Sequence, residues 1–224
     1  MGRLFLVGTP IGNLEDLSQR AKRILQTVTL VACEDTRVTR KLLSHYHLTT
    51  PVISLHQHSR PDDLGGVLDR VAAGQPVAVV TDAGMPGIAD PGGRLVAGAR
   101  ERGIPVEVVP GPSALTAALA LSGFPADRFW FVGFLPHKKG RPTLLRRIAA
   151  TEETVVVYES PHRLMKTLEA LATMMPNRRI AVCRELTKIH ESVVSGTAAE
   201  AHQHFQHHPD EVRGEIVLVV GPRS

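Results

Sequence analysis

Short apolar runs alternate with amphipathic segments through the first half of the chain. The apolar runs predict buried strands, and the amphipathic segments have the three-to-four-residue spacing of helices. The expected strands are residues 4–7, 29–33, 52–55, 77–80 and 106–109, and the expected helices are 16–28, 37–45, 62–73, 94–100 and 113–121. Such alternation is typical of βαβ units around a mostly parallel, buried sheet.

This pattern breaks at Ser122-Gly123-Phe124-Pro125, where glycine and proline interrupt the periodicity. The second half predicts strands at 129–134, 154–158, 180–184, 193–196 and 216–220, with helices at 143–150, 162–174 and 198–206. The expected fold class is therefore α/β, with two α/β domains. Residues 1–122 form the first, around a mostly parallel sheet, and residues 123–224 form the second, around a mixed sheet.

The composition is that of a soluble globular protein, with 43% hydrophobic and 21% charged residues among 224. The net charge of +4 is compatible with a polyanionic partner without requiring one. With 4% aromatic residues, a base-stacking platform is not expected. Cys33 and Cys183 lie in apolar runs, and no run approaches the ~18 apolar residues of a membrane span. We expect a cytoplasmic protein with reduced core thiols and no membrane association.

The strongest binding signal is residues 81–92, which follow the apolar run 77–80 and hold three glycines, two prolines and two aspartates. Open α/β sheets bind ligands at the carboxyl ends of their strands, and glycine lets backbone approach a ligand closely. Loops 8–13 and 110–113 follow two further strands, so all three can converge on one crevice. They suit an adenosine-type ligand that carries a positive charge, with Asp82 or Asp90 beside it. Helix capping is the alternative role for Asp90.

Other enzyme classes fit less well. Gly8 and Gly12 have neither the dinucleotide-binding spacing nor that of a phosphate-binding P-loop, which disfavours a dehydrogenase. His162 lies near a carboxylate, but no Gly-x-Ser-x-Gly motif accompanies it, which disfavours hydrolysis. The histidines between 202 and 208 are interpreted as surface residues, and no metal is expected.

Charged residues gather where strands end in the second half, at 158–163, 184–188 and 213–215. A basic loop at 137–141 contains Lys138, Lys139 and Arg141. Such a loop can bind nucleic-acid phosphates, and the alternative is an ordinary solvated loop.

A series of motifs follows in order along the chain: Val7-Gly8-Thr9-Pro10-Ile11-Gly12-Asn13-Leu14, Cys33-Glu34-Asp35-Thr36-Arg37, Asp82-Ala83-Gly84-Met85-Pro86, Asp90-Pro91-Gly92, Pro110-Gly111-Pro112-Ser113-Ala114, Gly133-Phe134-Leu135-Pro136, Tyr158-Glu159-Ser160, His162-Arg163 and Arg184-Glu185-Leu186-Thr187-Lys188. Taken together, these motifs resemble one family, the bacterial 16S rRNA cytidine 2′-O-methyltransferases of the tetrapyrrole methylase superfamily. The resemblance covers practically the whole chain, and the ordered series is specific although single motifs are not.

The resemblance implies a homodimer with S-adenosyl-L-methionine in a cleft between the two domains. It implies methylation of a cytidine ribose 2′-hydroxyl in the 16S rRNA of the 30S ribosomal subunit. The implied cofactor contacts are Pro10 or Ile11, Asp82, Gly84, Ile88, Asp90, Ser113, Ala114, Tyr158, Leu186 and Glu215. The sequence departs from the family pattern at two places: Met85 replaces a usual threonine, which we expect to be tolerated, and the sequence stops at Ser224 where relatives are expected to continue into a helical segment.

Methyl transfer from a sulfonium is a direct displacement, so positioning the reactants is the protein's main task. A base that takes the ribose proton would add about 10²–10⁴-fold. The candidates are Glu159, Glu185 and Lys188, with Arg37, Arg163 and Arg184 expected to hold phosphates. Two alternatives stay open: methylation of a small, precorrin-type tetrapyrrole by the same fold, and a ligand- or RNA-binding protein without catalysis.

Overall fold

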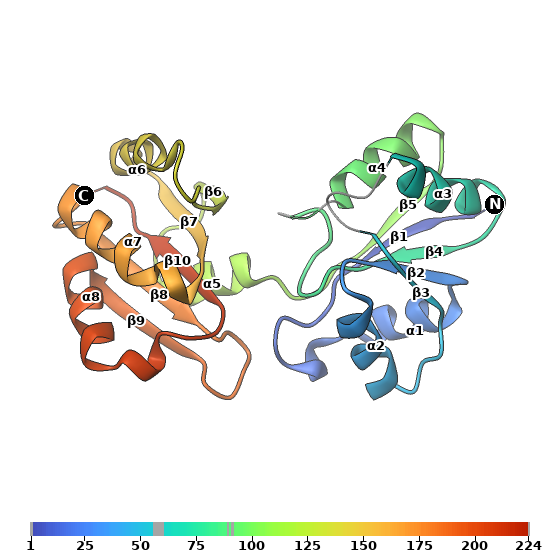
Figure 1. Ribbon diagram of the computed structural model, residues 1–224, viewed down its shortest axis with the longest axis horizontal. Helices are drawn as coiled ribbons and strands as arrows, with labels where there is room; N and C mark the ends of the chain where they lie inside the picture. The colour runs from blue at the N-terminus through green and yellow to red at the C-terminus, as the bar shows by residue number, and fades with distance from the viewer. Residues whose placement is uncertain (1, 56–60, 89, 91, 224) are drawn as a thin grey trace. The chain divides into compact units, whose positions relative to one another are not determined.

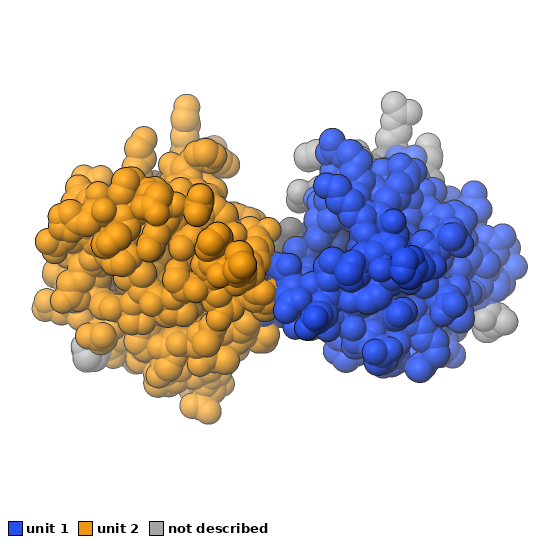
Figure 2. Space-filling view, turned by 90° about the horizontal axis from the view of Figure 1, so that it is seen from below, with its two compact units in different colours: residues 1–113 blue, residues 114–224 orange. Residues whose placement is uncertain are grey.

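The computed structural model describes residues 2–55, 61–88, 90 and 92–223. The chain divides into two compact units, residues 1–113 and residues 114–224 (Figure 2). Within the described residues, no helix is both long and apolar enough to cross a membrane.

The first unit is built on a five-stranded parallel sheet of order β3-β2-β4-β1-β5. Its strands are β1 (Leu4–Val7), β2 (Leu30–Cys33), β3 (Val52–Ser54), β4 (Val77–Val79) and β5 (Val106–Val109). Helices α1 (Gln19–Thr27) and α2 (Thr36–His45) cover one face, and α3 (Pro61–Ala72) and α4 (Gly92–Glu101) cover the other (Figure 1). The predicted parallel α/β arrangement is confirmed.

Apolar side chains fill both faces of this sheet. Val7 and Val31 pack with the α1 and α2 layer. On the other face, Leu4 and Val77 pack in one cluster with Leu95 of α4. Because strands in such a sheet are buried on both sides, they appear in the sequence as continuous apolar runs.

Helix α1 begins later than predicted. Residues Leu14–Asp16 form a separate 3₁₀ turn, and the Ser18 side chain accepts a hydrogen bond from the Ala21 amide, which caps α1 at its first turn. A serine in this position satisfies one of the helix's free N–H groups, so the helix starts after it.

The second unit contains a mixed sheet of order β6-β7-β10-β8-β9, which confirms the predicted sheet type. Its strands are β6 (Phe129–Phe134), β7 (Thr154–Glu159), β8 (Arg179–Arg184), β9 (Ser192–Thr197) and β10 (Ile216–Val220). Strands β6 and β7 are parallel, and β10 runs antiparallel to both β7 and β8. Helices α6 (Arg141–Ala150), α7 (Pro161–Met174) and α8 (Ala198–His207) form its main core with one face of the sheet; a 3₁₀ turn, Pro209–Glu211, follows α8.

Helix α5 (Ala114–Ser122) belongs to the second unit, so the units divide before this helix and not after residue 122 as predicted. The helix contacts β10 and β8, and the Cys183 thiol lies 3.8 Å from the Ala118 carbonyl. Gly123 adopts a positive φ of 69°, so the glycine and proline that suggested a boundary mark a turn within this unit.

A buried arginine links three segments of the second unit by hydrogen bonds. Arg178 donates to the carbonyls of Gly221 at 2.6 Å, Ile148 at 2.8 Å and Glu153 at 2.8 Å. Burial lowers the pKa of Arg178. Its removal would leave carbonyl oxygens without their donors inside the protein.

We predict that Arg178→Ala lowers the free energy of unfolding of this unit by about 3 kcal/mol, because several charge-assisted hydrogen bonds are lost. Trp130, the single tryptophan, lies on β6 and reports unfolding of this unit in urea. Arg179→Ala removes an exposed neighbour and is the control. Equal urea midpoints for the two variants would contradict the assignment.

Candidate active site

Loops after β1 and β4 meet at the carboxyl edge of the first sheet. Thr9 and Gly84 form an antiparallel bridge, in which the Thr9 amide donates to the Gly84 carbonyl at 2.9 Å and the Gly84 amide donates back at 3.1 Å. The buried Thr9 hydroxyl also donates to the Thr81 carbonyl at 3.1 Å. Backbone hydrogen bonds therefore fix one loop against the other.

The loop after β5 joins them through direct backbone contact. A Cβ atom built on Gly8 would lie 2.7 Å from the Cα of Gly111 and 2.7 Å from the Sδ of Met85. Real Cβ contacts are not this short, so these loops approach closely only because glycine has no side chain. Met85, where the resemblance predicts threonine, places its thioether against Gly8.

Asp82 and Asp90 both accept hydrogen bonds from backbone amides. Asp82 accepts from the Asp35 amide at 2.9 Å, which links the loop after β4 to the loop after β2. Asp90 accepts from the amides of Gly87 at 2.8 Å, Ile88 at 3.2 Å and Gly92 at 2.7 Å. Its carboxylate thus organises the loop and the start of α4. This role is close to helix capping, the alternative role predicted for Asp90.

The remaining predicted contacts lie on these loops or directly after them. Pro10 and Ile11 are buried, and the Cγ2 of Ile11 lies 3.4 Å from a Cβ built on Gly84. Ile88, on the loop after β4, is half-exposed. Ser113 ends the loop after β5, and Ala114 begins α5. Ala89 and Pro91 lie outside the described residues.

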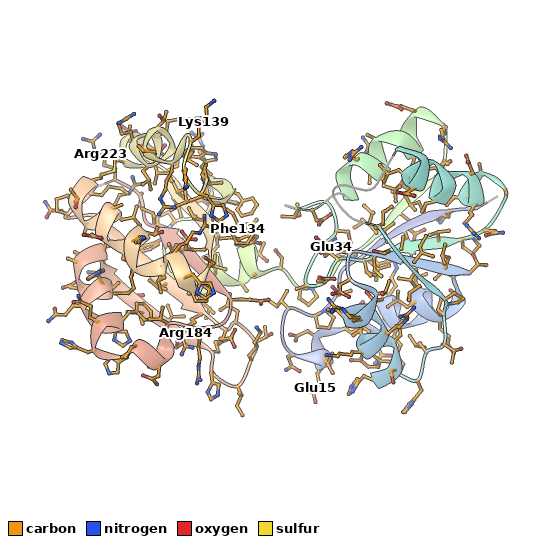
Figure 3. All side chains as sticks on the ribbon, in the orientation of Figure 1. Glu15, Glu34, Phe134, Lys139, Arg184 and Arg223 are labelled. Carbon is orange, nitrogen blue, oxygen red and sulfur yellow. The ribbon has the colours of Figure 1, made fainter. Side chains whose placement is uncertain are left out.

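The charged motifs of the second unit gather at one edge of its sheet. Ile216 at the start of β10 pairs with both Glu159 at the end of β7 and Arg184 at the end of β8. Phe134 ends β6, which runs parallel to β7 (Figure 3). Because β10 runs antiparallel to β7 and β8, its first residue lies beside the last residues of both strands, and the charged segments at these positions lie close together.

Glu159 is the centre of a buried network. Its carboxylate side chain has no exposed surface, and it lies 2.7 Å from Arg163 Nη2 and 3.8 Å from Arg141 Nη1. It accepts from the Thr167 hydroxyl at 2.6 Å and from the Ser160 amide at 2.9 Å. Arg141 and Arg163, two of the residues expected to contact nucleic-acid phosphates, are therefore engaged by this carboxylate.

The same network holds both ends of the basic loop. Arg163 donates to the Leu135 carbonyl at 2.6 Å, and Arg141 donates to the Thr167 hydroxyl at 2.7 Å. Lys138 and Lys139, between these anchors, are exposed, and Lys139 projects from the surface in Figure 3.

Glu185, Lys188 and Glu215 form a second charged cluster at this edge. The ammonium of Lys188 lies 2.8 Å from Glu185 Oε1 and 3.2 Å from Glu215 Oε2, and the Glu215 amide donates to Glu185 Oε1 at 2.9 Å. Burial opposes the charged form of Glu185, but hydrogen bonds from Lys188 and the Glu215 amide lower its pKa overall. Burial likewise opposes the charged form of Lys188, but its two carboxylate partners raise its pKa.

The backbone around this cluster is unusual. Glu185 and Thr187 adopt positive φ angles of 51° and 66°, a region that non-glycine residues rarely occupy. Gly214 has a φ of 78°, and a Cβ built on it would lie 2.1 Å from Glu185 Oε1. Leu186, between the strained residues, is buried. Such strain is characteristic of functional sites.

Tyr158 and Arg184 complete the edge. The Tyr158 ring packs edge-on against Phe131 at 5.0 Å and Phe134 at 5.5 Å, and burial raises its pKa. Arg184 is 5% exposed, with Nε 3.2 Å from the Ser192 hydroxyl. Its Nη1 has no hydrogen-bond partner among the described residues.

Sequence reasoning missed Thr9 and Thr167. Thr9 lies inside a loop predicted from the sequence, but the sequence did not indicate that Thr9 would form a backbone bridge with Gly84. Thr167 lies on α7, eight residues after Glu159, and belongs to no motif, so nothing in the sequence marked it. Within the described residues, no three His, Cys, Asp or Glu side chains are grouped to hold a metal ion.

The model of the family of tetrapyrrole (corrin/porphyrin) methylases matches residues 3–202. A relative from Synechocystis sp., named ribosomal RNA small subunit methyltransferase I, is 49% identical over 98% of this chain and 79% of its own length. A relative of the same name from Thermotoga maritima is 43% identical over 100% of both chains. That relative has no further segment, whereas the Synechocystis relative is longer than the part that matches, so the expectation of a further segment holds for some relatives and not for others.

Among solved structures, uroporphyrin-III C-methyltransferase from Thermus thermophilus, complexed with S-adenosylhomocysteine, is similar with a TM-score of 0.66 and 25% identity. The match covers 98% of this chain and 97% of that one. It extends over both units, so their α/β architecture is that of a known methyltransferase fold.

We predict that Gly111→Ala destabilises the first unit by about 1–3 kcal/mol, because the new Cβ meets Gly8 backbone at 2.8 Å. The matched control is Gly93→Ala on α4, whose Cβ meets nothing within 4 Å. That change replaces a helical glycine and is expected to be neutral or stabilising by up to ~1 kcal/mol. Thermal unfolding followed by circular dichroism measures both, and equal midpoints would contradict the close contact.

Proposed function

Because this chain belongs to the tetrapyrrole methylase family, and within it to the ribosomal RNA small subunit methyltransferases I, we propose that it methylates 16S rRNA. The substrate is the 2′-hydroxyl of a cytidine ribose in the 30S subunit, and the methyl donor is S-adenosyl-L-methionine. The observation that carries this proposal is the near full-length similarity to the rRNA methyltransferases, at 43–49% identity. Such a substrate implies action in the cytoplasm.

The three loops of the first unit suit this donor. S-adenosylmethionine supplies an electrophilic methyl group on a positively charged sulfur. The loops carry the exposed carboxylate of Asp82 and the half-exposed Ile88, and residues 8–13, 81–92 and 110–113 include no Lys or Arg. We propose that Pro10, Ile11, Gly84, Ile88, Ser113 and Ala114 contact the cofactor, with Asp82 facing its ribose or its charge.

Asp90 has a different role in this proposal. Its carboxylate is engaged by amides of its own loop, so it holds the loop in shape rather than binding directly. The contacts of Tyr158, Leu186 and Glu215 with the cofactor stay predictions from the family resemblance.

The geometry ranks the candidates for handling the ribose proton. Glu159 is enclosed and engaged by Arg163, so it is the least available. Lys188 is held as an ammonium, which is a donor and not a base. Glu185 is the more accessible of these two carboxylates, with 17% of its side chain exposed, and its lowered pKa makes it a weak base. We therefore assign Glu185 mainly to orienting the ribose hydroxyl, with acceptance of its proton late in the transfer.

Burial and ion pairing also divide the candidate phosphate-binding residues into those that could contact RNA and those that support the protein. The exposed Lys138, Lys139 and Arg37 are proposed to contact RNA, whereas Arg184 is too buried for the phosphate contact expected of it. Arg141 and Arg163 support the loop that carries the two lysines. The proposed working form is a homodimer, as the family resemblance implies.

Labelled S-adenosylmethionine tests the proposal against its alternatives. The protein is incubated with unmethylated 30S subunits, with naked 16S rRNA, or with a precorrin-type tetrapyrrole. We expect label in 2′-O-methylcytidine of 16S rRNA, identified by nucleoside mass spectrometry. Label on the tetrapyrrole alone would favour the small-molecule alternative, and cofactor binding without transfer to any substrate would favour a binding protein.

We predict that Glu185→Gln lowers kcat on 30S subunits by about 10–100-fold, because a neutral amide accepts the hydroxyl proton poorly. The dissociation constant for S-adenosylmethionine, measured by calorimetry, is expected to change little. Glu211→Gln, on the 3₁₀ turn after α8, is the control and is expected to retain wild-type kcat. An unchanged kcat for Glu185→Gln would remove Glu185 from the mechanism.

For Glu159→Gln, in contrast, we expect a positioning effect. Loss of the buried charge weakens the hold on Arg141 and Arg163 and loosens the basic loop, which raises KM for 30S subunits more than it lowers kcat. In a variant that already carries Lys138→Ala and Lys139→Ala, the same change is expected to add little to KM. A selective fall in kcat would instead return Glu159 to the list of candidate bases.

A further inference from the structure

Helices α1 and α2 carry an unusually one-sided charge. Their nineteen residues, Gln19–Thr27 and Thr36–His45, include six Lys or Arg and no Asp or Glu. The six are Arg20, Lys22, Arg23, Arg37, Arg40 and Lys41. Both helices pack their apolar sides on the same face of the first sheet (Figure 1), so the cations lie on one outward layer, which we call the α1–α2 face.

Half of these cations have partners within the unit. Arg20 pairs with Glu107, Arg37 pairs with Asp35, and the Lys22 ammonium lies 5.1 Å from the centre of the Tyr46 ring. Hydrogen bonds from Arg37 lower the pKa of Asp35 to about 2, so this pair stays ionised at neutral pH.

The other three cations are uncompensated. Arg23, Arg40 and Lys41 are exposed, and none forms an ion pair with any described residue. An exposed cluster without carboxylates raises the local concentration of polyanions.

The opposite layer of the same unit is different. Helices α3 and α4 mix Asp63, Asp69 and Glu101 with their arginines, and Arg102, just after α4, pairs with Asp69 at 2.6 Å. The basic character of the α1–α2 face is therefore specific to that face and does not simply follow from the net charge of the chain.

The cations of α2 extend along the helix from its first turn, which is the end nearest to the ligand loops. The helix starts three residues after β2, at the edge where the ligand loops lie, and Arg37 is in its first turn. Arg40 and Lys41 follow at spacings of three and four residues, so all three share one side of the helix. Arg40 and His47 then line a surface hollow together with Ser44, Thr49 and Thr50, which are hydrogen-bonding groups.

We propose that the α1–α2 face binds the phosphate backbone of the rRNA that flanks the methylated nucleotide. This inference rests on the proposed function and adds a second RNA contact, separate from the basic loop of residues 137–141. Arg37 would hold a phosphate near the site, and Arg40, Lys41 and Arg23 would hold the chain beyond it. Side chains of this kind bind phosphates without reading base sequence.

The dependence of 30S binding on salt tests the proposal. Arg40→Gln with Lys41→Gln removes two proposed phosphate contacts, and Arg70→Gln with Arg100→Gln removes two exposed cations from α3 and α4 as the matched control. Each lost contact is expected to reduce the slope of log affinity against log salt by about 0.7–0.9. The first pair should thus lower the slope by about 1.4–1.8 and weaken binding about 25–60-fold near 0.1 M salt.

Calorimetry with S-adenosylmethionine should give the same dissociation constant for wild type and both pairs. An unchanged slope for the α2 pair overturns the inference, and so does an equal reduction in both pairs, which would report net charge alone. Methylation of 30S subunits by the wild-type protein is measured in parallel. If methylation is absent, the proposed function fails. If methylation is present and the slope is unchanged, only the α1–α2 assignment fails.

Discussion

The contact between the backbones of Gly8 and Gly111 is the constraint on which the candidate active site depends. Two strand-end loops can touch there because neither residue has a side chain. The Thr9–Gly84 bridge then fixes a third loop in the same place, with hydrogen bonds of 2.9 and 3.1 Å. These contacts are formed by backbone, so they hold the loops in position without a bound ligand and limit the entropy that binding must remove.

The second unit presents its chemistry in a different way. Its sheet edge carries two charged clusters, one buried around Glu159 and one partly exposed around Glu185, Lys188 and Glu215. The buried cluster holds a basic loop in place, whereas the exposed cluster keeps charged groups accessible in a strained backbone. Residues of the same chemical types therefore serve as support in one cluster and as candidate reactive groups in the other.

Much of the fold was predictable because a parallel sheet buries both faces and leaves continuous apolar runs such as Val77–Val79. The loops were predictable because glycine and proline mark them. The division between the units was not, since the turn at Gly123 resembles a boundary in sequence while α5 packs on the second sheet. The engagement of Glu159 by Arg163 and Thr167 was also invisible, because burial and side-chain contacts depend on packing.

The central claim is that the glycine-bearing loops of the first unit form the cofactor site. Amide hydrogen exchange with and without S-adenosylhomocysteine tests it most directly. Binding is predicted to slow exchange in peptides that cover residues 8–13, 81–88 and 110–114, with little change in α3 and α4 beyond its first turn. Protection confined to other segments, or no protection at saturating ligand, would contradict the account.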